Sequence, residues 1–103
     1  MLTYCLQCEG PAYYVGRTKD LHRRLRQHWS GRGARWVALH PPIRLLEVRA
    51  HDVERQTTLE YMRLYGWNIV RGGPWTTVRS IGKPRDLEEE KTMATYAYDG
   101  PAL

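Results

Sequence analysis

Residues 13–28 read YYVGRTKDLHRRLRQH, and the rest of the chain is arranged around this stretch. Its first residues favour a strand, Gly16 lets the chain turn away from a sheet, and the remainder has the pattern of a basic amphipathic helix. Thr18 is a good N-cap residue, and Asp20 lies in the first turn, where a carboxylate complements the helix dipole. The sequence therefore predicts a strand, a turn and a helix that begins at Lys19.

The predicted helix has an apolar stripe with polar residues beside it. Leu21, Leu25 and Trp29 are spaced four residues apart, which predicts the side that packs against the rest of the domain. Arg24 and His28 are also four residues apart, so they share one face next to this stripe. Because the helix that carries Arg24 and His28 directly follows a strand, we expect their side chains to lie close to the sheet.

Another strand precedes this stretch. Residues 2–7 are β-prone, residues 9–11 have the composition of a turn, and residues 12–15 are again strand-like. These segments predict a hairpin, with Tyr4 on its first arm and Tyr14 on its second.

The chain beyond the first helix supplies a third strand. Residues 34–40 favour a short helical turn, which Pro41 and Pro42 end. Residues 43–48 have the composition of a strand and are expected to join the hairpin. The predicted fold class is α+β, with a small three-stranded antiparallel sheet flanked by helices.

A second long helix is expected over about residues 51–65. Two carboxylates separate on its helical wheel: Glu54 falls on the inward arc, whereas Glu60 points to solvent. A carboxylate on a buried face needs a partner, either a metal ion or a nearby arginine. The same inward arc holds Thr58, Tyr61, Met62 and Tyr65.

The following segment is rich in glycine. Residues 67–75 form a predicted loop in which two glycines follow Arg71, and their backbone N–H groups could approach a phosphate. Residues 75–81 are expected to be a strand or an extended segment. A last helix is predicted over residues 87–98, and its three consecutive glutamates repel nucleic acid, so we expect it to lie away from a binding face.

The length of 103 residues allows a single modest core, and no internal repeat or domain boundary is visible. We therefore assign residues 1–81 to one domain and residues 82–103 to a helical extension and tail of the same domain.

The formal net charge of +5 favours an anionic partner, above all nucleic acid. Arg35 and Trp36 place a cation beside an aromatic ring on which a base could stack, although Trp36 could equally close the core.

Membrane and secretory segments are absent from the sequence pattern. No run of about 18 apolar residues is present, and the first residues lack a secretory signal, so a soluble intracellular protein without a membrane partner is expected. Cys5 and Cys8 have C-x-x-C spacing, but no second pair with zinc-ligand spacing is present and the pair lies on a predicted strand. Two reduced cysteines are expected, with a zinc or redox site as the alternative.

These motifs together resemble the GIY-YIG nucleases, small α+β domains that cut nucleic-acid phosphodiester bonds with one divalent metal ion. Leu2-Thr3-Tyr4 occupies the position of the first family motif, with Leu-Thr in place of Gly-Ile, and Tyr14-Val15-Gly16 occupies that of the second. Arg24 and His28 lie where the family keeps its helical arginine and its histidine or tyrosine. The resemblance covers residues 2–75, and the loop Asn68-Ile69-Val70-Arg71-Gly72-Gly73 is similar to that of small stand-alone members.

The resemblance implies a metal-dependent endonuclease, with DNA as the expected substrate. Tyr4 would be the general base and Tyr14 its hydrogen-bonded companion, with an exchange of these two roles left open. Arg24 would clamp the scissile phosphate, and His28 would bond a tyrosine hydroxyl or a phosphate oxygen and relay a proton. Glu54 would hold one Mg²⁺ or Mn²⁺ ion.

Two alternatives stay open. Glu60 lies on the same helix as Glu54, although the helical wheel and the spacing to Asn68 favour Glu54. The second function to consider is a nucleic-acid-binding module that has lost catalysis. The residues expected to contact nucleic acid are Arg17, Arg23, Arg35, Trp36, Asn68 and Arg71.

Overall fold

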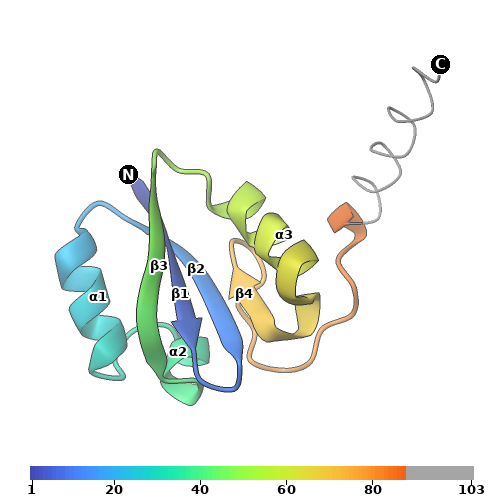
Figure 1. The fold of residues 1–103 in the computed structure, drawn as a ribbon, viewed down its shortest axis with the longest axis horizontal. Helices are drawn as coiled ribbons and strands as arrows, with labels where there is room; N and C mark the ends of the chain where they lie inside the picture. Colours follow the sequence, from blue (N-terminus) through green and yellow to red (C-terminus); the bar gives the residue numbers. More distant parts are fainter. Residues whose placement is uncertain (88–103) are drawn as a thin grey trace.

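The computed structural model describes residues 1–87, and the predicted helix over residues 87–98 lies outside this range apart from its first residue. The chain begins with two strands, continues with two helices, and then forms a strand, a helix, a short turn and a last strand (Figure 1). In chain order the elements are β1 (Leu2–Cys8), β2 (Ala12–Thr18), α1 (Leu21–Trp29), α2 (Arg35–Leu39), β3 (Pro42–Ala50), α3 (Glu54–Tyr65), the 3₁₀ turn η1 (Trp67–Ile69) and β4 (Val70–Gly72).

The sheet has four strands in the order β3-β1-β2-β4. The predicted hairpin and third strand are confirmed: β1 pairs antiparallel with β2 and with β3. The prediction of three strands was wrong, because β4 adds a fourth strand that runs parallel to β2, with Tyr14 opposite Arg71. A buried strand of three residues is too short to show a two-residue alternation, so the segment resembles a loop in sequence.

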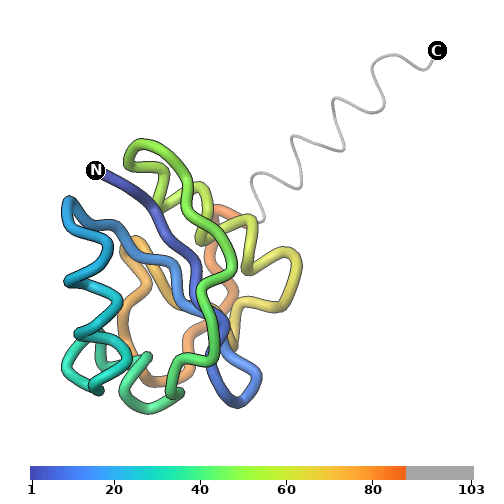
Figure 2. The backbone as a smooth tube through the Cα atoms, turned by 60° about the vertical axis from the view of Figure 1, so that its left-hand side comes forward, coloured from blue at the N-terminus to red at the C-terminus, as the bar shows by residue number. Residues whose placement is uncertain are grey.

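Helices cover both faces of the sheet, as two views of the chain show (Figures 1 and 2). Successive residues of a strand point to opposite faces, so Tyr13 and Tyr14 belong to different core clusters. Tyr13 packs with Leu59 and Met62 of α3. On the other face, Tyr14 packs with Tyr4 and Leu6, with Trp36 and Val37 of α2, and with Leu21 and Leu25 of α1.

Helix α1 differs from its prediction at both ends. Its N-cap is Asp20 instead of Thr18, and the Asp20 carboxylate accepts from the N–H of Arg23 at 3.1 Å. At the other end Trp29 is 47 % exposed, whereas His28 is 1 % exposed. A helix advances about 100° per residue, so His28 lies only about 20° from the direction of Leu21, and Trp29 lies about 80° away.

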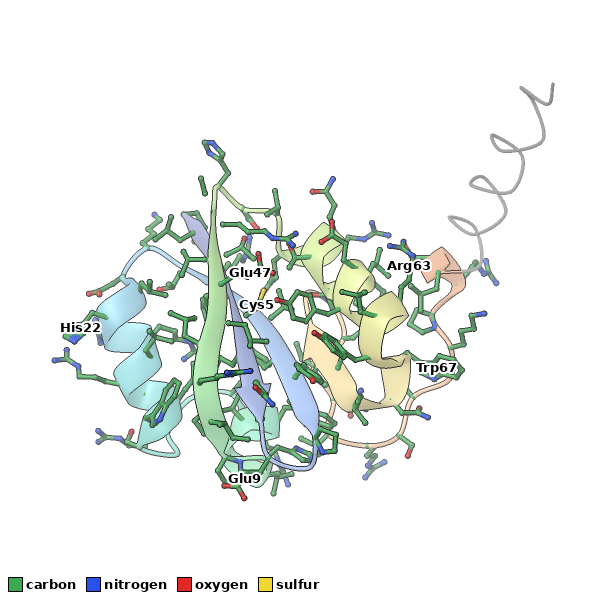
Figure 3. All side chains as sticks on the ribbon, in the orientation of Figure 1. Cys5, Glu9, His22, Glu47, Arg63 and Trp67 are labelled. Atoms are coloured by element: carbon green, nitrogen blue, oxygen red, sulfur yellow. The ribbon has the colours of Figure 1, made fainter. Side chains whose placement is uncertain are left out.

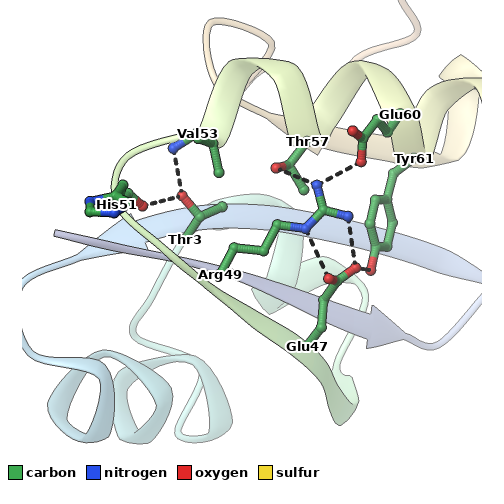
Figure 4. Close-up of polar contacts among 8 residues, drawn as sticks. All are labelled: Thr3, Glu47, Arg49, His51, Val53, Thr57, Glu60 and Tyr61. Carbon is green, nitrogen blue, oxygen red and sulfur yellow. Dashed lines mark hydrogen bonds and ion pairs between the residues drawn. The ribbon is translucent and has the colours of Figure 1, made fainter.

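Helix α3 begins at Glu54, later than predicted, because β3 continues to Ala50 and a short connection follows. The buried side chain of Thr3 holds this connection: its hydroxyl donates to the carbonyl of His51 at 3.0 Å and accepts from the N–H of Val53 at 2.9 Å (Figure 4). Sequence reasoning treated Thr3 only as part of a strand motif.

The inward arc of α3 is confirmed at Tyr61 and Met62, which are 5 % and 2 % exposed. Tyr65 was predicted to point inward but is 45 % exposed, and its ring stacks on that of Tyr13 with the centroids 4.0 Å apart. Among residues 1–87, no helix is long and apolar enough to span a bilayer.

Candidate active site

Two tyrosines from β1 and β2 meet a histidine from α1 in the core. The Tyr4 hydroxyl and Nε2 of His28 are 2.6 Å apart, and both side chains are buried. The ring centroid of Tyr14 lies 6.3 Å from that of Tyr4 and 5.3 Å from that of His28. The hairpin and the last turn of α1 therefore place these predicted residues in one cluster.

Gly16 makes room for this cluster. It lies opposite Tyr4 in the strand pairing, and a Cβ atom there would overlap the Tyr4 hydroxyl and lie 2.9 Å from the Tyr14 ring. The expectation that Gly16 turns the chain was wrong, since β2 continues through it to Thr18. The glycine is needed because an aromatic side chain crosses directly over the strand.

The hydrogen bonds of His28 assign its proton. The main-chain N–H of Ala34 points to Nδ1 at 3.4 Å, so Nδ1 is the acceptor. In a neutral imidazole the other nitrogen then carries the hydrogen, which means that Nε2–H donates to the Tyr4 oxygen. Burial, together with the charge of Arg24, lowers the pKa of His28 to about 4, so the ring is neutral at pH 7.

This lowered pKa predicts acid sensitivity of the fold. An unfolded histidine binds its proton at a pKa of about 6.5, whereas the folded protein resists protonation until about pH 4. Above pH 6.5 His28 is neutral in both the folded and the unfolded chain, so it costs the fold no stability. As the pH falls to 4, the free energy of unfolding decreases by on the order of 3 kcal/mol. Urea unfolding at pH 7.5 and pH 4.5 measures this loss, which should shrink in His28→Gln but persist in the variant of an exposed histidine, His22→Gln. Equal losses in all three proteins would contradict it.

Arg24 reaches the two tyrosines from α1. Burial alone lowers its pKa, but its contacts with the hydroxyls of Tyr4 and Tyr14 outweigh this and leave the pKa above its usual value. Burial raises the pKa of Tyr4 and of Tyr14, and Arg24 opposes the rise at both. Arg24 also donates to Gln27 at 2.8 Å, which orients the guanidinium along the helix.

Glu54 stands at the first turn of α3, beside an open cleft of about 600 Å³. Its side chain is 18 % exposed, and burial raises its pKa while Arg17 opposes the rise. Its negative charge also contributes to the raised pKa of Tyr4 and of Tyr14, as a smaller cause than burial. The cleft is lined by Arg17, Asp52, Val53, Glu54, Arg55, Gln56, Gly73 and Pro74.

Arg17 joins two carboxylates in this cleft. Its guanidinium lies 2.5 Å from Asp52 and 3.7 Å from Glu54. Sequence reasoning missed Asp52 as a site residue because it was assigned to the start of the helix. An acidic residue two positions before Glu54 was the available signal.

Glu60, the alternative carboxylate, belongs to a different network (Figure 4). It accepts from Arg49 at 2.6 Å, and Arg49 also contacts Glu47 at 2.9 Å. The hydroxyl of Tyr61 donates to Glu47 at 2.6 Å. Figure 3 shows Glu47 near Cys5, between the sheet and α3, on the face that Tyr13 occupies and Tyr14 does not. The structure therefore places Glu54, and not Glu60, with the tyrosines.

Two residues predicted to contact nucleic acid lie in the core. Arg71 is 1 % exposed, lies 4.3 Å over the Trp36 ring, and donates to five main-chain carbonyls. Trp36 is 5 % exposed and donates to the carbonyl of Tyr13 at 3.0 Å. An arginine before two glycines resembles a surface loop in sequence, but here its guanidinium ties the segment around β4 together. Arg23, Arg35 and Asn68 are exposed.

The two cysteines do not form a paired site. Both are buried and free, and three positions apart on a strand they point to opposite faces of the sheet. Burial raises the pKa of Cys5 to about 11 and that of Cys8 to about 12, so neither is a thiolate at neutral pH. This excludes the zinc or redox alternative for this pair.

Comparisons with known proteins agree with this arrangement. A family model described as the GIY-YIG catalytic domain matches residues 1–63. A UPF0213 protein of Cupriavidus necator is 44 % identical over 53 residues, which is 52 % of this chain and 58 % of that protein. A UPF0213 protein of Xanthomonas axonopodis is 44 % identical over 43 residues, 42 % of each chain. The UPF0213 protein YazA of Bacillus subtilis is 30 % identical over 53 residues, 52 % of this chain and 54 % of that protein.

The chain spans about half the length of the curated relatives it matches. The solved structures contain no significant match. The family match nevertheless runs from β1 into α3 and includes Tyr4, Tyr14, Arg24, His28 and Glu54. The chain belongs to the GIY-YIG catalytic domain family.

Proposed function

We propose that the protein is a metal-dependent endonuclease that hydrolyses phosphodiester bonds in nucleic acid, with DNA as the expected substrate. The observation that carries this proposal is the convergence of a hydroxyl, an imidazole, a guanidinium and a carboxylate: Tyr4, His28, Arg24 and Glu54. Hydrolysis of a phosphodiester needs a base for water, a cation against the developing charge and help for the leaving oxygen. Membership of a nuclease family supports the same reaction.

Tyr4 is the proposed general base. In the free protein burial raises its pKa, so the phenol is protonated at pH 7. Its oxygen accepts the Nε2–H of His28, and the Arg24 guanidinium lowers its pKa, so both groups favour the deprotonated form. Tyr14, whose ring centroid lies 6.3 Å from that of Tyr4, is the proposed companion, and the reverse assignment of the two tyrosines is the second arrangement. Arg24 would hold the scissile phosphate by two parallel hydrogen bonds.

The residues at the cleft fit a divalent cation bound by one carboxylate. Among residues 1–87, no three or more His, Cys, Asp or Glu side chains gather as a metal-binding group. Mg²⁺ keeps several waters and takes one or two carboxylates with substrate phosphates, which suits Glu54 beside an open cleft. When bound, the ion would supply Lewis-acid polarisation of the phosphate and lower the pKa of a water. If Glu54 bound the cation instead of Arg17, the Arg17 guanidinium would still be paired with Asp52.

A substrate screen tests this function. The full chain is incubated with labelled single-stranded DNA, duplex DNA, branched DNA and RNA, with Mg²⁺ or Mn²⁺ and with an EDTA control. We expect cleavage that requires the metal. Binding without products in either metal would favour a binding module over a nuclease.

Gly33 is predicted to be needed for activity because of its distance to His28. A Cβ atom there would overlap Nδ1 of His28 and lie 2.9 Å from its Cε1 atom. We expect Gly33→Ala to displace the imidazole from Tyr4 and lower the cleavage rate about 100-fold, at the lower end of the range for one acid–base group.

Gly82→Ala is the matched control, because nothing lies within 4 Å of a Cβ atom at that position. Cleavage rates and thermal melting of both variants separate a site effect from a folding defect. Wild-type cleavage by Gly33→Ala would show that the position of His28 does not matter.

A further inference from the structure

The net positive charge of the chain equals that of one segment around α1. Residues 19–35 carry six Lys and Arg side chains and one acidic side chain, a net charge of +5. This equals the formal net charge of the whole chain, so the remaining residues carry equal numbers of cations and anions. The excess charge is a local feature of this segment, whose cations are Lys19, Arg23, Arg24, Arg26, Arg32 and Arg35.

Two adjoining hollows on the surface of α1 are lined by these side chains. Arg23 and Gln27 line both hollows, so the two lie side by side, and Arg24 borders the second. Arg24 also contacts the two site tyrosines, so this surface begins at the candidate active site. The first hollow, of about 470 Å³, is lined by Arg23, Arg26, Gln27 and Arg32. The second, of about 250 Å³, is lined by Thr18, Lys19, Asp20, Arg23, Arg24 and Gln27.

Several arginines elsewhere in the described part of the chain form ion pairs with carboxylates. Arg17 pairs with Asp52, Arg49 with Glu47 and Glu60, and Arg55 with Asp86. None of the ion pairs within residues 1–87 includes Arg23, Arg26 or Arg32. Within the same range, the Arg32 guanidinium donates to the hydroxyl of Ser30, at 3.2 Å.

The like charges of these arginines repel each other when no anion is bound to α1. Arg23 and Arg26 are three residues apart on α1, so their like charges are neighbours on the helix surface. Both are exposed, and Figure 3 shows the adjacent His22 pointing away from the sheet. A strip of cations that the fold does not neutralise is suited to an external anion.

We propose that Arg23, Arg26, Gln27 and Arg32 form a track that binds the sugar–phosphate backbone beside the scissile phosphate. The nine residues of α1 span about 13 Å, and a duplex strand carries one phosphate per about 3.4 Å of axis, so three or four phosphates fit. The track rests on the proposed function, because the bound strand is the one whose phosphodiester reaches Arg24.

The chemistry of the track also predicts how the substrate is chosen. Guanidinium and amide groups contact phosphates, which carry no base sequence, so binding along α1 is independent of sequence. The apolar side of α1 packs against the sheet through Leu21 and Leu25, so the helix presents no broad apolar face to a bilayer. Nucleic acid is therefore favoured over an anionic membrane surface.

Salt-dependent binding of the full chain tests the track. Fluorescence anisotropy in EDTA measures the affinity for labelled 20-nucleotide single strands and duplexes of two unrelated sequences over a range of NaCl concentrations. The test variant combines Arg23→Gln, Arg26→Gln and Arg32→Gln. The control removes three other exposed cations by Arg44→Gln, Arg79→Gln and Lys83→Gln, and circular dichroism checks that both proteins are folded.

Each lost phosphate contact lowers the slope of log affinity against log salt by about 0.9 for duplex and about 0.7 for single-stranded DNA. We expect the slope of the track variant to fall by about 2 to 3, with at least about a tenfold loss of affinity near 0.1 M salt, on both sequences. The control variant should keep a slope near that of the wild type. Equal slopes for the two variants would overturn the track.

The same proteins separate the two proposals. If the wild type binds through these arginines but cuts no substrate with Mg²⁺ or Mn²⁺, the nuclease proposal fails and the track stands. If the wild type cuts and the two variants bind alike, the track fails and the nuclease proposal stands. Loss of binding to phosphatidylglycerol vesicles, without loss of binding to nucleic acid, would show that the arginines serve a membrane instead.

Discussion

An Arg24→Ala variant is expected to lose about 1,000-fold or more in cleavage rate while the domain stays folded, because it removes a preorganised cation from the developing charge. Two effects add. The phosphate loses its clamp, and Tyr4 loses the cation that opposes the rise of its pKa, so the proposed base becomes harder to deprotonate. The measurement is the single-turnover cleavage rate at saturating enzyme.

Arg24→Lys separates the effect of positive charge from the effect of the two hydrogen bonds to the phosphate. A lysine keeps the positive charge but cannot form two parallel hydrogen bonds to a phosphate, so activity should stay far below that of the wild type. Arg44→Ala removes an exposed arginine on β3, whose guanidinium donates to Gln7, and serves as the control for charge. If Arg24→Lys cuts like the wild type, charge alone suffices and the clamp is not required.

A Glu54→Gln variant is the second change with a large expected effect. Glutamine keeps the shape of the side chain but removes its charge, so binding of a divalent cation should weaken. We expect the cleavage rate to fall about 100-fold to 1,000-fold, similar to the loss of one electrostatic group at a reacting centre. Rates measured across a Mn²⁺ titration show whether the loss comes from metal affinity.

Glu60→Gln is the matched control, since it makes the same exchange on the same helix. Glu60 pairs with Arg49 in the network of Figure 4, so its loss should affect stability slightly and cleavage little. An inactive Glu60→Gln with an active Glu54→Gln would reverse the assignment of the metal-binding carboxylate.

Local patterns predicted the parts of the fold that bring the site together. The hairpin with Tyr4 and Tyr14 is confirmed, because each strand has its own composition and a turn separates them. The helix that carries Arg24 and His28 was also found, because four-residue spacing places two side chains on one face. The wheel of α3 separated Glu54 from Glu60, and the structure places them in different networks.

Contacts between distant parts of the chain could not be predicted from periodicity. The hydroxyl of Thr3 bonds to a segment 48 to 50 residues away, and no local pattern indicates this. Strand β4 is three residues long, and its parallel pairing with β2 depends on the return of the chain after α3. Arg71 was wrongly placed at the surface for the same reason, since its carbonyl partners come from the turns on either side of β4.

Cleavage in water enriched in ¹⁸O tests whether the site around Tyr4 hydrolyses phosphodiester bonds. The wild type and Tyr4→Phe are incubated with an oligonucleotide and Mn²⁺, and mass spectrometry measures the ¹⁸O content of the new terminal phosphate. We expect one ¹⁸O atom per cleavage by the wild type, no products in EDTA, and a severe loss of products with Tyr4→Phe. Wild-type rates for Tyr4→Phe, or no ¹⁸O in the products, would contradict hydrolysis at this site.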